Sequence, residues 1–203
     1  MIIASFDVGI RNLAFCILEI IDNSNINIIK WVVEDFIPTH KKVDNVDYAL
    51  LCSHCIKCLE KYQTYFLMCD EIIIEKQPTK NQKMKNVSFC IFTYFVMKFY
   101  NNGKLKKIRF VNPINKLNTY PLTPVKSTYS DKYKTRKYIG KIHCEYYIHN
   151  NHYLVNWFLI HKKKDDLADS FLQNIWYINY YKLKLNLTTL TVKHKIFLKS
   201  NII

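Results

Sequence analysis

The chain has 203 residues, of which 49% are hydrophobic, and this excludes a disordered protein and predicts one domain, or one with an appendage. Its formal charge of +14, from 30 Lys and Arg against 16 Asp and Glu, predicts a polyanionic partner, first nucleic acid and second an anionic membrane surface. No apolar run approaches the roughly 20 residues that cross a bilayer, and charges interrupt the opening run before it could act as a signal peptide, so we expect an intracellular protein without a membrane span.

The first apolar runs predict two strands joined by a tight turn. One run ends at Asp7 and Gly9, and apolar alternation resumes over 13–20. Open α/β sheets place their chemistry at the carboxyl edge, so Asp7 is a candidate site residue, although an Asp before a Gly is equally typical of a turn. A third strand is predicted over 26–36, and short connections favour an antiparallel meander.

Seven cysteines, an odd number, fit free thiols in a reducing compartment better than a disulfide framework. Cys52, Cys55 and Cys58 surround His54 within a helix predicted over 44–67, and this cluster resembles a zinc motif. At about 100° per residue the three cysteines share one stripe while His54 points away from it. We therefore predict core-facing thiols, with zinc as the alternative.

A continuous isoleucine run predicts a fourth strand over 70–75 that is buried on both faces and ends at Glu75. A strongly apolar helix is expected over 82–101, and a fifth strand over 106–111. The stretch 115–130 is predicted to be a loop. The order of these elements implies a mixed sheet in which strands one, four and five are parallel, which places the acids that end strands one and four side by side.

Two further helices are predicted after the loop. The helix over 131–149 mixes basic and apolar residues, and its exposed side is expected to carry Lys132, Lys134, Arg136, Lys137 and Lys141. The helix over 165–181 follows a run of three lysines, Lys162, Lys163 and Lys164. The tail over 182–203 has no clear pattern, and we predict at most a terminal strand or helix there.

The last helix supplies a third group of acids. Asp166 and Asp169, at positions i and i+3, share one helix face. Acids in a first turn also complement the helix dipole, so this group is weak evidence by itself. Three groups of carboxylates in a chain of charge +14 nevertheless predict a site for Mg²⁺ or Mn²⁺, a pair of which can promote phosphodiester hydrolysis.

The motifs DVGIRN, IIIEKQP and KKDDLAD, in this order, resemble the RuvC-type Holliday-junction resolvases of the RNase H-like superfamily, and most closely the poxvirus resolvases. The resemblance covers residues 1–181. It implies an α/β, RNase H-like mixed sheet with the strand order 3-2-1-4-5, flanked by helices. It also implies a nuclease domain over 1–181, which leaves 182–203 as a C-terminal extension of unknown role.

The resemblance assigns roles to individual residues. Four positions match the family's metal-binding acids, which would hold two Mg²⁺ ions, with Mn²⁺ as a substitute: Asp7, Glu75, Asp166 and Asp169. Asp165 is extra and is expected to point away from this face. The family also has a basic residue that assists at the scissile phosphate, for which Lys137 is our lead, although a phosphate-contacting lysine is an equal alternative. Substrate contacts are expected from Arg11 and Asn12, which turn and strand-edge roles also explain, and from Lys132, Lys134, Arg136, Lys141 and Lys162, Lys163 and Lys164.

The function implied is metal-dependent resolution of four-way DNA junctions by paired nicks, with water as the nucleophile, and without a nucleotide cofactor. Two cuts on opposing strands require a homodimer, and the helix over 82–101 is apolar on more than the one face that its own sheet needs. The alternative is that the C-terminal tail covers that helix. A viral protein of this kind would act at replication sites in the host cytoplasm or in the virion.

Three other functions compete with this prediction. An actin- or sugar-kinase-like ATPase needs Gly-rich phosphate loops, which three glycines cannot easily supply. A non-catalytic nucleic-acid-binding protein would leave the acids unexplained, because carboxylates repel phosphate unless a metal lies between them. An RNase H that cuts RNA–DNA hybrids is the runner-up, since the fold does not separate it from a resolvase.

Overall fold

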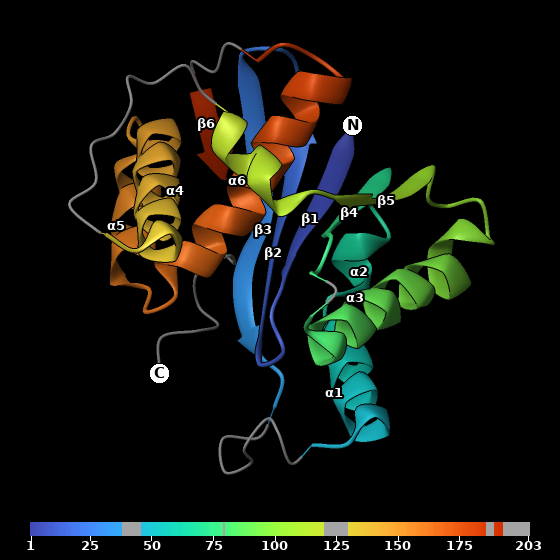
Figure 1. Cartoon of the computed structure of the whole chain (residues 1–203). Coiled ribbons are helices and arrows are strands. Elements are labelled where there is room, and N and C mark those ends of the chain that lie inside the picture. Colours follow the sequence, from blue (N-terminus) through green and yellow to red (C-terminus); the bar gives the residue numbers. More distant parts are fainter. Residues whose placement is uncertain (38–45, 79, 120–129, 186–188, 193–203) are drawn as a thin grey trace.

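The computed structural model describes residues 1–37, 46–78, 80–119, 130–185 and 189–192. At its centre is a six-stranded mixed sheet with the order β5-β4-β1-β2-β3-β6 (Figure 1). The first three strands form an antiparallel meander, β4 and β5 run parallel to β1, and β6 runs parallel to β3. The strands are β1 (Ile2–Val8), β2 (Asn12–Ile20), β3 (Asn25–Asp35), β4 (Glu71–Glu75), β5 (Lys107–Val111) and β6 (Thr189–Val192). The predicted order 3-2-1-4-5 is confirmed, and the tail adds β6 beside β3.

Helices cover both faces of this sheet (Figure 1). One layer contains α1 (Tyr48–Glu60), α2 (Gln63–Phe66) and α3 (Gln82–Phe95), and the other contains α4 (Lys132–Ile148), α5 (His152–Ile160) and α6 (Lys164–Tyr181). Alternation along the strands sends Phe6 and Phe15 into the first core and Ile3 and Trp31 into the second. Among the helices described, none is both long and apolar enough to span a membrane.

The turn between β1 and β2 depends on its glycine. The Gly9 amide donates to the carbonyl oxygen of Asn12 at 3.0 Å. A Cβ atom on Gly9 would lie only 2.6 Å from that same oxygen, so a side chain does not fit without moving the backbone. The tight turn therefore ends β1 just after Asp7, whose backbone pairs with Ala14 of β2.

Two local predictions are corrected by the structure, and one helix had not been predicted. The helix expected over 44–67 is divided into α1 and α2 near Tyr62, whose ring packs on Phe15 and whose hydroxyl donates to Glu34. The helix expected over 82–101 comprises α3 followed by a π-helical turn, η2 (Val96–Tyr100). α5 was not predicted, because its run HYLVNWFLI is too apolar to show one stripe.

The loop expected over 115–130 begins with a short 3-10 helix, η3 (Pro113–Asn118). Asn112 caps it by accepting a hydrogen bond from the Ile114 amide, and Pro113 occupies its first turn. Residues 120–129 of that expected loop lie outside the described residues. This short helix matters because it places one lysine at the edge of the sheet.

The cysteines of α1 face the core as predicted. Cys55 and Cys58 are buried, Cys52 is half-buried, and all seven cysteines are free thiols. Cys90 of α3 packs against this core from the neighbouring helix. The prediction of core-facing thiols is confirmed for Cys55 and Cys58.

Candidate active site

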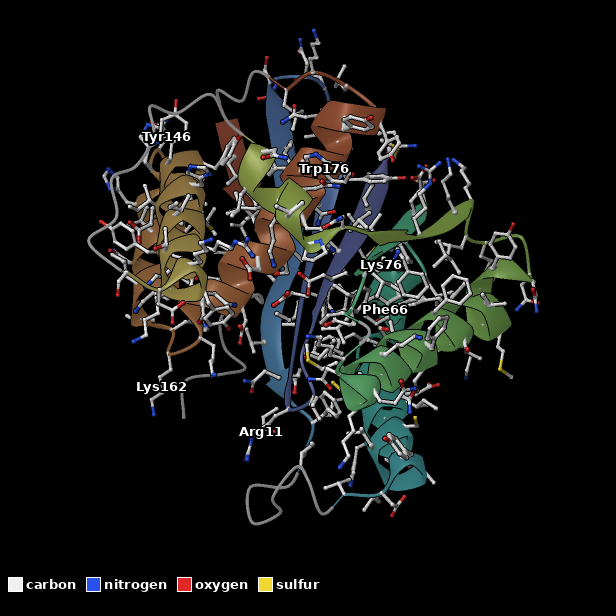
Figure 2. The ribbon with its side chains drawn as sticks, viewed as in Figure 1. Arg11, Phe66, Lys76, Tyr146, Lys162 and Trp176 are labelled. Carbon is white, nitrogen blue, oxygen red and sulfur yellow. The ribbon has the colours of Figure 1, made fainter. Side chains whose placement is uncertain are left out.

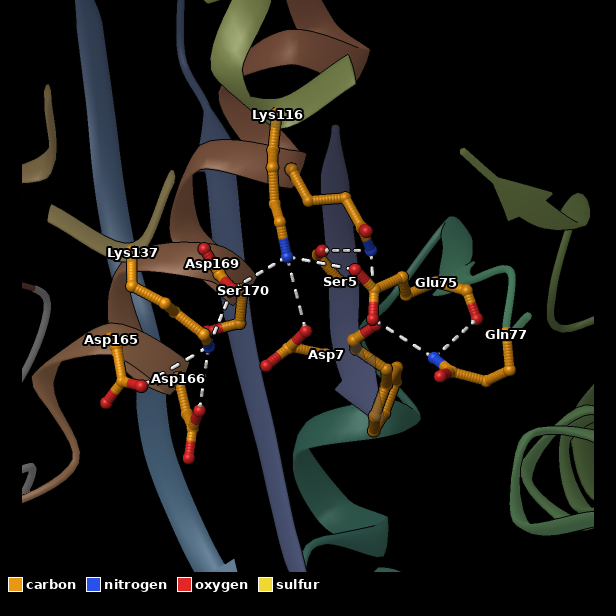
Figure 3. A network of polar contacts seen from close by, with 12 residues as sticks. Ser5, Asp7, Glu75, Gln77, Lys116, Lys137, Asp165, Asp166, Asp169 and Ser170 are labelled. Carbon is orange, nitrogen blue, oxygen red and sulfur yellow. Dashed lines mark hydrogen bonds and ion pairs between the residues drawn. The ribbon is translucent and has the colours of Figure 1, made fainter. Parts of the chain in front are cut away.

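Five elements bring acidic and basic side chains together at the carboxyl edge of β1 and β4 (Figure 3). β1 and β4 are parallel neighbours in register at Phe6 and Ile74, so the next residues, Asp7 and Glu75, lie beside each other. The first turns of α6 bring Asp165, Asp166 and Asp169 to the same place, while η3 supplies Lys116 and α4 supplies Lys137. The predicted convergence of the three acidic groups is thus present in the geometry.

Lys116 joins three of the acids. Its Nζ lies 2.8 Å from Asp169 Oδ2, 2.9 Å from Glu75 Oε1 and 3.4 Å from Asp7 Oδ1. Its side chain is 11% exposed, and burial alone would favour the neutral amine. The three carboxylates outweigh that effect and raise the lysine's pKa, so the group is an ammonium ion.

Sequence reasoning missed Lys116, because so short a helix has no periodicity to detect. One signal was present: Asn112-Pro113 directly follows β5, and this pair is typical of a capped helical turn. Since β5 is parallel to β4, such a turn begins at the same edge of the sheet as Glu75.

Lys137 contacts the acids of α6. Its Nζ lies 3.1 Å from Asp169 Oδ2, 3.2 Å from Asp166 Oδ1 and 3.3 Å from Asp165 Oδ2. Lys137 therefore points into the site, unlike Lys132 and Lys134 of the same helix, which are exposed. The expectation that Asp165 points away is wrong, because the long lysine side chain lies across the first turn of α6 and reaches both adjacent carboxylates.

The cluster contains more acidic groups than basic groups. Burial, followed by repulsion from Glu75, raises the pKa of Asp7 to about 7, against the opposing effect of the two lysines. Burial also raises the pKa values of Asp166 and Asp169. Burial acts on Asp165 in the same direction, but Lys137 and a backbone hydrogen bond outweigh it, so the pKa of Asp165 is lowered. Five carboxyl groups face two ammonium groups, an arrangement that favours additional cations.

The donor set fits hard divalent cations, which prefer carboxylate oxygens. Within the described ranges, no three His, Cys, Asp or Glu side chains are arranged around one point as a metal site. The two lysine ammonium groups instead lie between the acids, where the surrounding carboxylates stabilise their positive charge (Figure 3). Metal binding would require these ammonium groups to move away from the inner oxygens.

Hydrogen bonds to the sheet hold α6 in place. The Gln173 side-chain amide donates to Ser5 Oγ at 2.9 Å and to the Phe6 carbonyl at 3.2 Å, one residue before Asp7. Asn174 donates to the Cys16 carbonyl at 2.7 Å, and the Trp31 indole donates to the Leu167 carbonyl at 2.9 Å. All of these bonds are buried, so the position of the α6 acids relative to β1 is well defined.

The acids line a cavity of about 650 Å³. Its wall also contains Arg11, Asn12, Arg136, Lys137 and Lys163. The remaining predicted DNA-contacting residues lie outside the wall: Lys132, Lys134, Lys141, Lys162 and Lys164. Arg11 is held by an ion pair with Asp35, with Nε 2.8 Å from Oδ2. Arg11 and Lys162 project at the same end of the molecule in Figure 2.

Solved structures with a similar fold include two resolvases. The crystal structure of the fowlpox virus Holliday junction resolvase aligns with a TM-score of 0.59 and 22% identity, covering 88% of this chain and 99% of that one. Thermus thermophilus RuvC aligns with a TM-score of 0.55 and 10% identity, covering 88% of this chain and 96% of that one. These likenesses confirm the predicted RuvC-type α/β fold.

Sequence comparison finds a viral relative and a viral family. The uncharacterized protein L451 of Acanthamoeba polyphaga mimivirus is 31% identical over an alignment of 144 residues that covers 65% of this chain and 35% of that protein. The matched region therefore spans about a third of that relative's length. The family model described as poxvirus A22 protein matches residues 1–181. Because that match covers both strand-end acids and the acidic turn of α6, the chain belongs to the poxvirus A22 protein family.

Proposed function

We propose that this chain is a divalent-metal-dependent DNA endonuclease that resolves four-way junctions. The observation that carries the proposal is the convergence of Asp7, Glu75, Asp166 and Asp169 at one edge of the sheet in a protein of charge +14. Carboxylates on a phosphate-binding surface need cations between them and the substrate. The likeness in fold to the fowlpox virus Holliday junction resolvase supports a branched DNA substrate.

The four acids would hold the cations, which we propose are two Mg²⁺ ions, with Mn²⁺ able to substitute. When bound, such ions lower the pKa of the attacking water and stabilise the charge that develops on the phosphate oxygens. Asp7 and Glu75 come from rigid neighbouring strands, so their spacing is set by the sheet. The acids of α6 are set by its buried hydrogen bonds to β1 and β2.

The two lysines supply positive charge beside the scissile phosphate. Lys137, our lead for the assisting residue, reaches the acids from α4, and Lys116 is a second candidate that reaches them from η3. Both are ammonium ions because the carboxylates raise their pKa values. With cations bound to the acids, either ammonium group would be free to contact a phosphate oxygen.

Basic residues around the cavity would bind the DNA arms. Arg11 and Asn12 extend from the turn between β1 and β2, and Arg136 and Lys163 line the cavity from α4 and the start of α6. The outer basic surface consists of Lys132, Lys134, Lys141, Lys162 and Lys164. Such contacts position the phosphate backbone without reading sequence, as recognition of a branched shape requires.

The working unit is a homodimer, because one cluster of acids cuts one strand and a junction needs two opposing cuts. α3 and η2 turn Phe89, Met97 and Tyr100 outward, with exposed fractions of 49%, 68% and 50%. The alternative is that the tail covers α3. In the described part of the tail, β6 pairs with β3 at the opposite edge of the sheet from β5, so β6 does not cover α3. We place the dimer interface on this outward face.

We assign the nuclease domain to residues 1–181 and treat 182–203 as an extension that adds β6 to the sheet. For a protein of a poxvirus family, the expected place of action is the host cytoplasm. An RNase H that cuts RNA–DNA hybrids is the second candidate, since it would use the same acids on the same fold.

Side-by-side digestion tests the proposal. A four-way DNA junction, a linear duplex and an RNA–DNA hybrid are each incubated with the protein and Mg²⁺, with EDTA as the control. We expect cleavage of the junction alone, dependent on the metal. Cleavage of the hybrid in preference to the junction would establish the second candidate, and binding without any cleavage would leave a non-catalytic protein.

A further inference from the structure

Gln77 lies two residues beyond Glu75, just after the end of β4, and its side chain is turned back toward the cluster (Figure 3). Its Nε2 donates a hydrogen bond to Glu75 Oε2 at 3.0 Å and a second one to the Glu75 carbonyl oxygen at 3.3 Å. Gln77 is 7% exposed, so water does not compete strongly for these bonds. One glutamine therefore holds both the backbone and the carboxylate of an acid in the site.

The orientation of the Gln77 amide follows from simple chemistry. The Glu75 carbonyl oxygen can only accept a hydrogen bond, so the nitrogen of the amide, and not its oxygen, must face Glu75. The amide oxygen, Oε1, is then directed elsewhere, where it is buried and has no hydrogen-bond partner among the described residues. A buried carbonyl without a partner lowers stability. Packing alone therefore does not explain a glutamine at position 77. The donor group that faces Glu75 does explain it.

The two oxygens of Glu75 have different partners. Oε2 accepts from Gln77, on the outer side of the cluster, and Oε1 lies 2.9 Å from Lys116 Nζ, on the cavity side. Fixing Oε2 also fixes the rotation of the carboxylate, and so it directs Oε1 toward the cavity. Residues that orient metal-binding side chains in this way typically change metal affinity about 10- to 100-fold when they are removed.

We propose that Gln77 is a positioning residue that holds Glu75 in the orientation that binds a divalent cation. This inference rests on the proposed function, because it assumes that Glu75 is a metal ligand. It adds a residue that lies outside the cavity wall and that acts through the carboxylate of Glu75.

The test uses variants that keep the size of the side chain. Gln77→Met removes the donor and also the unpaired oxygen, and Gln77→Glu presents an acceptor to an acceptor. Gln82→Met is the matched control, because Gln82 is exposed at the start of α3 and, among the described residues, its side chain bonds to Asn86 of the same helix. The readout is the rise in melting temperature of the full chain as Mn²⁺ is titrated, checked by the electron paramagnetic resonance signal of free Mn²⁺.

We expect Gln77→Met to melt close to the wild type in EDTA and to need about 10- to 100-fold more Mn²⁺ for half of the maximal shift. Gln77→Glu should show a similar loss, and Gln82→Met should match the wild type. If Gln77 had only a structural role, Gln77→Met would lower the melting temperature in EDTA and leave the Mn²⁺ midpoint unchanged.

Two outcomes would overturn the inference, and they distinguish its failure from the failure of the proposed function. If the wild type binds Mn²⁺ and Gln77→Met or Gln77→Glu binds it equally well, Gln77 does not position Glu75. If the wild type itself shows no Mn²⁺-dependent shift and no Mn²⁺ uptake, the metal site is wrong, and the inference is lost together with it.

Discussion

Lys116 Nζ lies 2.8 Å from Asp169 Oδ2, and this contact joins η3 to α6 across the carboxyl edge of the sheet. The same ammonium group reaches Glu75 and Asp7, so it neutralises acids that come from three different elements. A cluster with fewer cations than acids is stable only while positive charge remains in it. On the proposed function, lysine ammonium groups and metal ions would therefore substitute for one another here.

Lys116→Met should destabilise the protein in EDTA by about 3 kcal/mol, because it leaves buried carboxylates without their partner. Mg²⁺ should restore part of this loss, since a ligand that binds only the folded state stabilises it. Thermal unfolding in EDTA and in Mg²⁺ measures both effects. Lys132→Met, at an exposed position on α4, is the control. Equal melting of Lys116→Met and the wild type in EDTA would mean that the ion pairs contribute nothing.

DNA binding should have a steep salt dependence that the basic surface controls. Lys162 and Lys163 are exposed just before α6, and each lost phosphate contact should reduce the log–log salt slope by about 0.9. Fluorescence anisotropy of the Lys162→Gln/Lys163→Gln variant on a labelled junction, across a salt series, tests this. Lys57→Gln, on the exposed side of α1, is the control. An unchanged slope in the double variant would show that these lysines face solvent in the complex.

The outward face of α3 and η2 should mediate dimerisation. Met97 is 68% exposed, and Met97→Glu places a charge that would be buried on association, which should weaken dimerisation at least about tenfold. Sedimentation at micromolar protein compares it with the wild type. Met68→Glu is the control, at a methionine that is 45% exposed near the end of α2. A wild type that is monomeric both alone and on the junction would refute the proposed dimer.

Cys90 should be the most reactive thiol. A hydrogen bond from the Cys55 thiol, with help from Cys52 and against the effect of burial, lowers the pKa of Cys90 to about 7. Burial instead raises the pKa of the Cys52 thiol to about 11. Alkylation by iodoacetamide should reach Cys90 first, and its rate should rise between about pH 6 and pH 8 as the thiolate forms. Peptide mass spectrometry identifies the site, and faster labelling of Cys52 would contradict the assignment.

The sheet could be predicted because its strands follow simple patterns. The isoleucine run of β4 indicated burial on both faces, and all five of its residues are buried. Parallel strands end at a common edge, so the proximity of Asp7 and Glu75 followed from the order of the elements alone. The acidic turn of α6 was also evident, since its spacing defines one helix face.

The features of the site that the sequence did not predict depend on structure that leaves no periodic pattern in the sequence. η3 is too short to show a pattern, so Lys116 was assigned to a loop. The direction of the Lys137 side chain depends on how α4 packs beside α6. That side chain is long enough to contact Asp165 as well as Asp166. The hydrogen bond from Gln77 to Glu75 is equally a matter of side-chain conformation.

Mapping of nicks on a four-way junction with labelled strands tests the central claim most directly. With Mg²⁺, the wild type should make two symmetry-related nicks on opposing strands. Four single variants should each abolish these nicks, because each removes the charge of a proposed metal ligand: Asp7→Asn, Glu75→Gln, Asp166→Asn and Asp169→Asn. Each should bind the junction as well as or better than the wild type, because it also removes a charge that repels phosphate. Asp165→Asn should retain more activity than any of these. Near wild-type nicking by any one of the four variants, or nicking by the wild type in EDTA, would contradict the account.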